Sequence, residues 1–242
     1  MSTILAPPPP AWIADPDAVA WVQGQTGAAL RDEAAVEVAE VLLAEAGLPL
    51  HPDRAKNWDT FLAVFHALRL GGLAAPVLDA GAERYSMFLP AMRRLGAADL
   101  TGINLVFGAP ETVDGIVYRH GDITDTGFAA GRFSFIACLS VIEHGVDPAA
   151  FFREAARLLR PGGHAFVSFD YWEDGVETGG QCAYGVPIRI FTRNDVTAMQ
   201  RDAAVSDLAP VSTGDFRCAA RVAHWKRYGL RYTFANLLLR KT

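Results

Sequence analysis

The sequence is poor in cysteine, and its three cysteines are not arranged as metal ligands. Cys138, Cys182 and Cys218 lie far apart in the chain, and no CxxC pair occurs. An odd number of cysteines at wide spacing argues against a disulfide framework and against a zinc site. We therefore expect three reduced, partly buried thiols and no metal centre.

The sequence also lacks long hydrophobic runs and an excess of positive charge. No stretch approaches the ~20 apolar residues of a membrane span, and no basic segment followed by a hydrophobic run marks a signal peptide. A formal net charge of -5 disfavours nucleic acid as the main partner, because proteins that neutralise phosphates usually present a basic face. These absences predict a cytoplasmic protein without a membrane span, and they leave a homodimer open.

The chain does contain enough apolar residues for a large core. Hydrophobic residues make up 51% of the 242 residues and charged residues 20%, so the chain is expected to fold. We expect a flexible lead-in that includes the proline run, followed by a single domain. The lead-in covers residues 1–24 and the domain 25–242, divided into a helical cap at 25–72, a core at 73–170, and a lid with C-terminal strands at 171–242.

Two helical patterns precede the core, and each has one apolar face. Gly71 and Gly72 are expected to end the second helix. The apolar faces comprise Ala34, Val38, Val41, Leu42 and Ala46 in the first helix and Phe61, Leu62, Phe65 and Leu68 in the second.

From residue 76 onward, short apolar runs alternate with helical patterns. This alternation predicts an α/β fold: a Rossmann-like, doubly wound, mostly parallel sheet with N-terminal helices in addition. An antiparallel C-terminal strand is expected at 232–240, after a loop or lid at 171–190 and a helix that begins at Thr192. The parallel strands are expected at 76–80, 99–104, 115–119, 133–139 and 164–170.

The ends of the first two strands carry candidate ligand residues, because ligands of doubly wound sheets bind outside the carboxyl ends of the strands. Gly81 follows the first strand, where a glycine lets a cofactor approach the backbone. An ordinary strand-to-helix turn is the alternative. Asn104 ends the second strand, where an acidic residue often accepts hydrogen bonds from a ribose. A plain strand end is the alternative here.

The next two strand ends carry further candidates. The Asp122 carboxylate could accept a hydrogen bond from an adenine amino group while Ile123 covers the ring, or Asp122 could cap a turn. Leu139 and Ser140 would face the reaction centre. His144 could act as a general base, since its ordinary pKa suits proton transfer near neutral pH, or it could order the loop.

Together these segments resemble the class I S-adenosylmethionine-dependent methyltransferases, and in particular the methyltransferase type 11 group. The resemblance spans residues 77–170 and rests on segments 79–81, 121–125, 139–144 and 158–163, which have the order and spacing of that family. Residues 56–59 also look like an entry segment of some relatives.

The resemblance implies S-adenosylmethionine as the cofactor. Two departures from the family pattern are the missing glycines after Gly81 and the amide of Asn104 in place of an acid. By the resemblance, Asp79, Ala80 and Gly81 approach the methionine moiety, Asn104 and Leu105 stand at the ribose, Asp122 and Ile123 hold the adenine, and Leu139 and Ser140 line the sulfonium side.

Methyl transfer from a sulfonium is an in-line displacement that needs alignment and exclusion of water but no covalent intermediate. For a hydroxyl acceptor, His144 and Tyr171 are the candidates for removing the proton. The acceptor is expected to be a small molecule, such as a metabolite, a sugar or a lipid-linked glycan. Trp172 and Tyr184 offer flat surfaces for it.

Two other functions are compatible with the residues. The departures at Gly81 and Asn104 suit a catalytically inactive methyltransferase fold that serves as a binding or scaffold protein. A nicotinamide-dependent oxidoreductase is disfavoured, because the GxGxxG turn that lets a pyrophosphate approach the backbone is missing.

Overall fold

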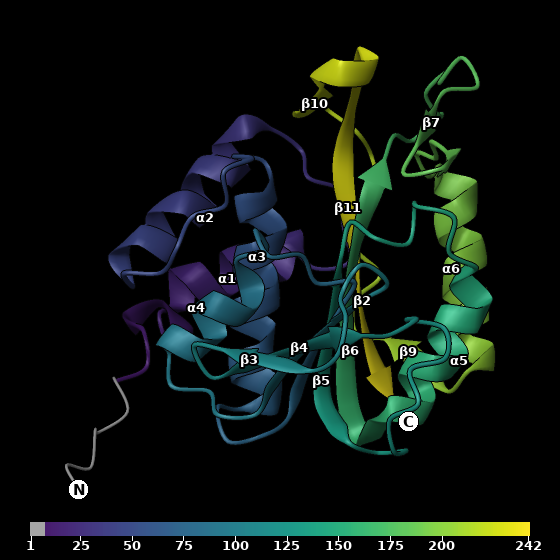
Figure 1. Ribbon diagram of the computed structural model, residues 1–242. Helices are drawn as coiled ribbons and strands as arrows, with labels where there is room; N and C mark the ends of the chain where they lie inside the picture. The colour runs from purple at the N-terminus through teal and green to yellow at the C-terminus, as the bar shows by residue number, and fades with distance from the viewer. Residues whose placement is uncertain (1–7) are drawn as a thin grey trace, which may run out of the picture.

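A mixed sheet of nine strands crosses the protein in the computed structural model, which describes residues 8–242 (Figure 1). Neighbouring strands follow the order β10-β11-β6-β5-β1-β2-β4-β3, and β9 pairs with β11. The parallel strands are β1 (Val77–Ala80), β2 (Leu100–Asn104), β4 (Ile116–His120), β5 (Phe133–Leu139) and β6 (Leu159–Tyr171). The antiparallel ones are β3 (Glu111–Val113), β9 (Leu208–Pro210), β10 (Ala223–Trp225) and β11 (Leu230–Lys241). The predicted fold class is confirmed.

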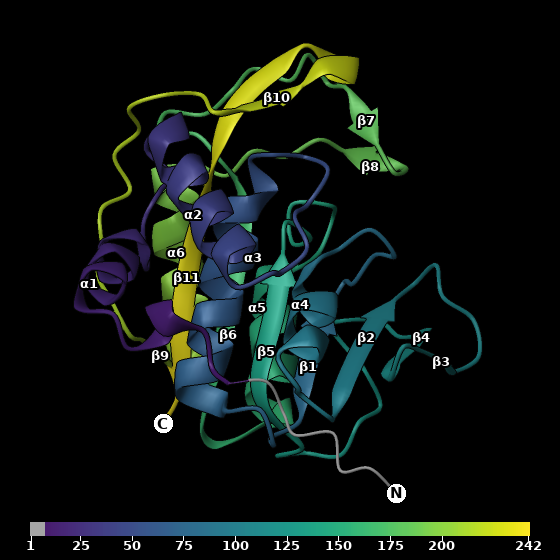
Figure 2. The same cartoon turned by 90° about the vertical axis from the view of Figure 1, so that its left-hand side faces the viewer.

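The strand order reverses between β1 and β5. From β1 the sheet continues to β2 and β4 on one side, and from β5 it continues to β6 on the other. The crevice outside the carboxyl ends at such a switch point is the usual ligand site of open α/β sheets. In Figures 1 and 2, these ends face the part of the molecule where β10 and the hairpin of β7 (Cys182–Ala183) and β8 (Val186–Pro187) lie.

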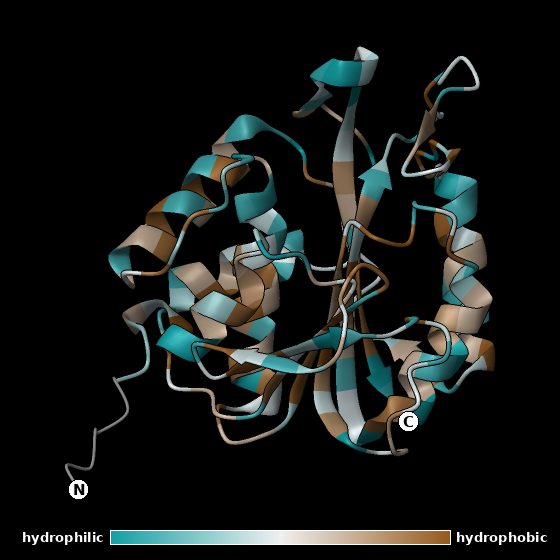
Figure 3. Ribbon diagram, viewed as in Figure 1, coloured by the Kyte–Doolittle hydropathy of each residue, from teal (hydrophilic) through white to brown (hydrophobic). Residues whose placement is uncertain are grey.

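Helices cover both faces of the sheet (Figures 1 and 2). Hydrophobic residues follow the central strands, whereas the outer helices mix hydrophobic with hydrophilic residues (Figure 3). No helix in the described part of the chain is long and apolar enough to cross a membrane. One face carries α1 (Pro16–Gln25), α2 (Glu33–Glu45), α3 (Lys56–His66) and α4 (Phe88–Arg94), and the other carries α5 (Pro148–Leu158) and α6 (Arg193–Val205).

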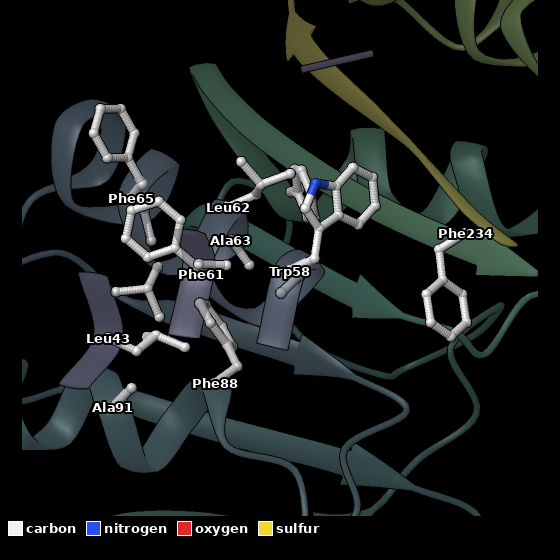
Figure 4. Packing of buried hydrophobic residues seen from close by; sticks show 14 of the residues in the cluster. Leu43, Trp58, Phe61, Leu62, Ala63, Phe65, Phe88, Ala91 and Phe234 are labelled. Atoms are coloured by element: carbon white, nitrogen blue, oxygen red, sulfur yellow. The ribbon is translucent and has the colours of Figure 1, made fainter. Parts of the chain in front are cut away.

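Helix α3 is the centre of the core on its side of the sheet. Trp58, Phe61 and Leu62 are completely buried, and Figure 4 shows them beside Leu43 and Phe88. Every residue of α3 from Asn57 to His66 is buried, and burying each large apolar side chain stabilises the fold by about 2–3 kcal/mol. This packing holds the first turn of α3 firmly against the sheet.

The apolar face predicted for α2 is wrong. The residues buried against α3 include Ala35, Ala39 and Leu43, while Val38 and Val41 are 38% and 55% exposed. Alanine, valine or leucine occurs on nearly every side of this helix, so the pattern allowed two faces. Contact with α3 selects one of them.

The structure also differs from the expected flexible lead-in. Residues 1–7 lie outside the described residues, but Ala11–Ile13 and Pro16–Gln25 are helical. The Trp12 side chain is 3% exposed, and its indole N–H donates a 2.9 Å hydrogen bond to the Leu42 carbonyl. Burial of this large ring anchors the segment to the helical layer.

Candidate functional site

The predicted cofactor residues meet at one edge of the sheet. β1 pairs with β2 through Ala80 and Ile103, and the amide of Gly81 donates a 2.9 Å hydrogen bond to the Ile103 carbonyl. β2 pairs with β4 through Asn104 and His120. The segments 79–81, 104–105, 122–123 and 139–140 therefore follow the carboxyl ends of four adjacent strands, in the order β5, β1, β2, β4.

Gly81 is required by the protein's own packing. Its φ of +92° lies in the region that favours glycine, and a Cβ built there would meet Val141 Cγ2 at 2.5 Å. Any other residue would be strained and would collide with Val141. The sequence suggested that a glycine is needed here to admit a cofactor to the backbone. The positive φ and the contact with Val141 are a second reason for glycine at this position.

The amide group of Asn104 is already engaged with the loop after β1. Its Nδ2 donates to the Ala82 carbonyl at 2.9 Å and to Glu83 Oε1 at 3.3 Å, and its Oδ1 accepts from the Val106 amide at 3.1 Å. Asn104 therefore holds the loop in place and brings the Glu83 carboxylate to the end of β2. Leu105 beside it is 63% exposed.

Asp122 and Ile123 form the turn after β4. One carboxylate oxygen of Asp122, Oδ1, accepts hydrogen bonds from the Thr124 amide at 2.8 Å and the Thr124 hydroxyl at 2.7 Å. The Asp122 side chain is exposed, while Ile123 is buried against the second hydrophobic cluster. Turn capping therefore engages only one oxygen of this exposed carboxylate.

Ser140 follows β5 in a strained conformation. Its φ is +53°, and its amide donates a 3.0 Å hydrogen bond to the Ser168 carbonyl of β6. The buried Ser140 Oγ finds no hydrogen-bond partner within residues 8–242. An L-residue with positive φ and an orphaned hydroxyl is unusual outside functional sites.

A buried acidic cluster lies below this edge, formed by Asp59, Asp79, Glu143 and Asp170. All four are at most 3% exposed. Across the described residues, Asp59 Oδ1, Asp79 Oδ2 and Glu143 Oε2 have no hydrogen-bond partner. Buried polar atoms normally find partners, so these oxygens mark a place where a polar ligand or water belongs.

Lys56 is the cation that faces the acidic cluster. Burial works to lower the pKa of its ammonium, but the nearby carboxylates, Asp59 first, outweigh that effect and raise the pKa. The Lys56 Nζ also lies 4.5 Å from the centre of the Phe234 ring. Lys56 is therefore charged and held in place, and it compensates one of four buried carboxyl groups.

Two members of the acidic cluster, Glu143 and Asp170, both have raised pKa values. Burial raises the pKa of Glu143 well above its ordinary value, and the charge of Asp170 raises it further. Burial also raises the pKa of Asp170, to about 6, although Lys56 opposes the rise. The Asp170 amide donates a 3.2 Å hydrogen bond to Glu143 Oε1, so the two residues are in direct contact.

His144 lies under an aromatic rim formed with Tyr184, Trp225 and Tyr228. The His144 and Tyr184 rings are 4.9 Å apart, Tyr184 stacks on Trp225 at 6.4 Å, and Trp225 meets Tyr228 at 4.6 Å. Burial, with a contribution from the charge of Lys56, lowers the pKa of His144 to about 4. The imidazole is therefore neutral near pH 7 and able to accept a proton.

Tyr171 does not belong with these residues. Its side chain is completely buried in the second hydrophobic cluster, and its hydroxyl donates a 2.8 Å hydrogen bond to the Phe216 carbonyl. Burial raises the pKa of this hydroxyl. The geometry gives a substrate no access to Tyr171, which corrects its assignment as a catalytic candidate. Trp172 stacks instead under Arg221, at 4.3 Å.

Sequence reasoning found only half of the acidic cluster. Asp79 was already assigned to the cofactor. Asp59 and Lys56 fall in the 56–59 segment already singled out, but Glu143 and Asp170 were not assigned a role, and neither was Glu83. Each carboxyl group follows or precedes an apolar run by one position, and only the sheet order brings them together. A signal that would have found them is the rarity of acids next to fully buried strands.

Comparison with known proteins agrees with this geometry. Residues 78–167 match the family model described as a methyltransferase domain. These residues run from β1 into β6 and so contain the whole switch point. The matched segment is therefore similar to a methyltransferase domain, and the protein shares the fold of solved methyltransferase structures.

Among the individual proteins, one similar relative is a ubiquinone biosynthesis O-methyltransferase of Cupriavidus pinatubonensis. It is 32% identical over 162 residues, which cover 53% of this chain and 64% of that protein. The chain spans about half the length of other curated relatives, such as the 46% covered in the enzyme of the same name from Acinetobacter baumannii.

Two solved structures share the fold at low sequence identity. A sarcosine dimethylglycine methyltransferase structure from Galdieria sulphuraria aligns with a TM-score of 0.57 at 16% identity, over 88% of this chain and 92% of that one. A 1,6-didemethyltoxoflavin-N1-methyltransferase from Burkholderia thailandensis, solved with its substrate and S-adenosylhomocysteine, aligns at 0.52 with 21% identity, over 86% and 88%.

Proposed function

We propose that this protein transfers the methyl group of S-adenosylmethionine to a small-molecule acceptor. The observation that carries the proposal is the common edge on which the segments after β5, β1, β2 and β4 meet. Adjacent strands are ~4.8 Å apart, so these four strand ends span about 14 Å, enough for an extended adenosyl-methionine skeleton. The methyltransferase domain match over residues 78–167 supports the same conclusion.

The residues at this edge fit the cofactor. The orphaned Asp79 Oδ2 and Ser140 Oγ lie at the two strands that flank the switch point, where the methionine end would supply polar partners. Asp122 retains a carboxylate oxygen for an adenine amino group, and Ile123 offers an apolar surface beside it. When bound, the cofactor supplies a methyl group activated by a positively charged sulfur.

The aromatic rim and the acidic cluster support an acceptor site next to the sulfonium position. The Tyr184 ring lies 4.9 Å from the ring of His144 and stacks on Trp225, and Glu143 directly precedes His144 in the loop after β5. Aromatic faces combined with carboxyl groups favour a ring that carries hydroxyl groups, such as a sugar, or a small aromatic metabolite. For such a hydroxyl, His144, which is neutral near pH 7, would be the group that accepts the proton.

One observation favours a second candidate, a catalytically inactive binding protein. Val141 occupies the space next to Gly81, and the Asn104 amide is already committed to the loop. If these side chains close the slot in solution, the fold has no room for the cofactor.

Isothermal titration calorimetry with S-adenosylmethionine and S-adenosylhomocysteine separates the two candidates. We expect saturable binding with a Kd of about 1–100 μM, which corresponds to roughly 5–8 kcal/mol of binding free energy. NADH serves as the control nucleotide and should give no heat. Absence of heat from both adenosyl ligands at millimolar concentration, with the protein folded, would reject the methyltransferase and favour the binding protein.

A further inference from the structure

We propose that Glu83 supplies the carboxylate that accepts the ribose hydroxyls of the bound adenosyl group, in place of the residue at the end of β2. This inference rests on the proposed function. It assigns Glu83, in the loop after β1, a binding role that its position in the sequence does not suggest. Asn104 acts as the residue that positions it.

The ribose of a bound adenosyl group has to lie between the two ends of the ligand. The methionine end belongs over β1 and β5, where Asp79 and Ser140 have orphaned oxygens, and the adenine belongs beside Asp122 after β4. β2 is the strand between β1 and β4. The ribose, which joins the two ends of the ligand, therefore falls over the end of β2, at Asn104.

The Asn104 side chain already uses its hydrogen-bonding groups within the protein. Its two amide hydrogens point to the carbonyls of Gly81 and Ala82 and to Glu83, at 3.4, 2.9 and 3.3 Å, and its oxygen accepts from Val106. A primary amide has two donor hydrogens, and these contacts use both. A pair of ribose hydroxyls needs an acceptor, and the Asn104 side chain is occupied.

The carboxylate of Glu83 lies next to Asn104, at the end of β2. Glu83 Oε1 is 3.3 Å from Asn104 Nδ2, so the negative charge that β2 lacks is supplied from the neighbouring loop. The loop is ordered, because the Glu83 amide donates to Ser86 Oγ at 3.1 Å and the Ser86 amide donates back to the Glu83 carbonyl at 3.1 Å. Glu83 is half-buried, which leaves part of its carboxylate accessible.

The neighbouring cation, Arg84, does not neutralise the charge of Glu83. Arg84 turns the other way: it pairs with Glu111 of β3, and its guanidinium lies 4.4 Å from the centre of the Tyr118 ring. In the part of the chain that the structure describes, no ion pair involves Glu83. Its carboxylate remains available to hydroxyl donors, and a charged acceptor makes such hydrogen bonds strong.

Calorimetry with S-adenosylhomocysteine and its 2′-deoxy and 3′-deoxy analogues tests the assignment. Wild type should bind the parent ligand about 10–100-fold more tightly than either analogue, the range expected for a hydrogen bond to a charged group. Glu83→Ala should lose a similar factor for the parent ligand and should no longer distinguish it from the analogues. Glu83→Gln should fall between the two. Glu45→Gln, which removes an exposed carboxylate at the end of α2, should behave as wild type.

Each other result has a definite meaning. Tighter binding by Glu83→Ala, with an unchanged melting temperature, would overturn the inference and show that Glu83 obstructs the slot. Equal binding of the parent and both analogues by wild type would overturn the ribose assignment while leaving the proposed function intact. Failure of wild type to bind any of the three ligands would reject the proposed function, and this inference with it.

Discussion

Asp79 lies at the end of β1 with its side chain 2% exposed, and burial raises the pKa of its carboxyl group to about 7, with a further contribution from the charge of Asp59. An aspartate in the unfolded chain titrates near 3.8. The folded protein therefore holds this proton between about pH 4 and pH 7, where the unfolded chain releases it. Because the unfolded chain gains stability by releasing this proton, the free energy of unfolding falls progressively over that interval.

Asp79→Asn should therefore stabilise the protein at pH 8 and leave its stability near pH 4 almost unchanged. The gain in the free energy of unfolding should grow from pH 4 to pH 7 and then level off, at roughly 2–4 kcal/mol. Urea denaturation at pH 4, 6 and 8 measures it. Asp174→Asn, an exposed control, should show no such trend. A gain that is the same at all three pH values would contradict the account of Asp79.

At the scale of elements, the loop that carries Asp122 is tied to α5 by a buried carboxylate. Glu154 Oε1 accepts from the Thr126 hydroxyl at 2.6 Å and the Thr126 amide at 2.9 Å, and Arg157 pairs with Glu154 at 2.7 Å. Burial alone would raise the pKa of Glu154, but the hydrogen bonds from Arg157 and Thr126 bring it to about 2. The loop that we propose for the adenine is therefore held in place by α5.

Removing this tie with Glu154→Ala should cost about 2–3 kcal/mol of stability, because the Thr126 amide and the Arg157 guanidinium lose their acceptor. The substitution should also weaken binding of S-adenosylhomocysteine by loosening the loop. Thermal melting and calorimetry check the two effects. Arg153→Ala, an exposed neighbour on the same helix, should change neither. Unchanged melting of the Glu154 variant would contradict the proposed tie.

Most of the sheet could be predicted from the sequence, because its central strands are continuous apolar runs between clear helix signals. β5 is an example: residues 133–139 are apolar apart from one serine, and the strand spans the predicted residues. β3 was missed, although Asp114 and Gly115, at φ of 51° and 80°, form the tight hairpin turn that this pair of residues favours. A three-residue edge strand is too short for a periodic signal.

The candidate site was predictable only along the strand ends. Asp122 and Ser140 follow strands directly, so the topology places them. The acidic cluster was not predictable, because its members come from separate elements. Asp59 lies in α3, Glu143 lies in the loop after β5, and Asp170 lies in β6. Their proximity depends on how α3 packs over the sheet, and no local pattern encodes that packing.

For the molecule as a whole, the two sides of the switch point carry different groups. The β1, β2 and β4 side carries the loops that we propose for the adenosyl group, while the β5 and β6 side carries Glu143 and Asp170 of the acidic cluster. Helix α3 spans both sides: its Asp59 accepts a 2.6 Å hydrogen bond from Ser168 of β6, and its charge reaches Asp79 of β1. A ligand that binds on one side should therefore change the electrostatic environment of the carboxyl groups on the other side.

The most direct test of the central claim is a crystal structure with S-adenosylhomocysteine. The account predicts ligand density along the carboxyl edge of the sheet, with the homocysteine end over Gly81 and Ser140, the ribose against Glu83 and the adenine beside Asp122 and Ile123. Density elsewhere, or an edge that stays closed by Val141 at ligand concentrations that saturate binding in solution, would contradict it.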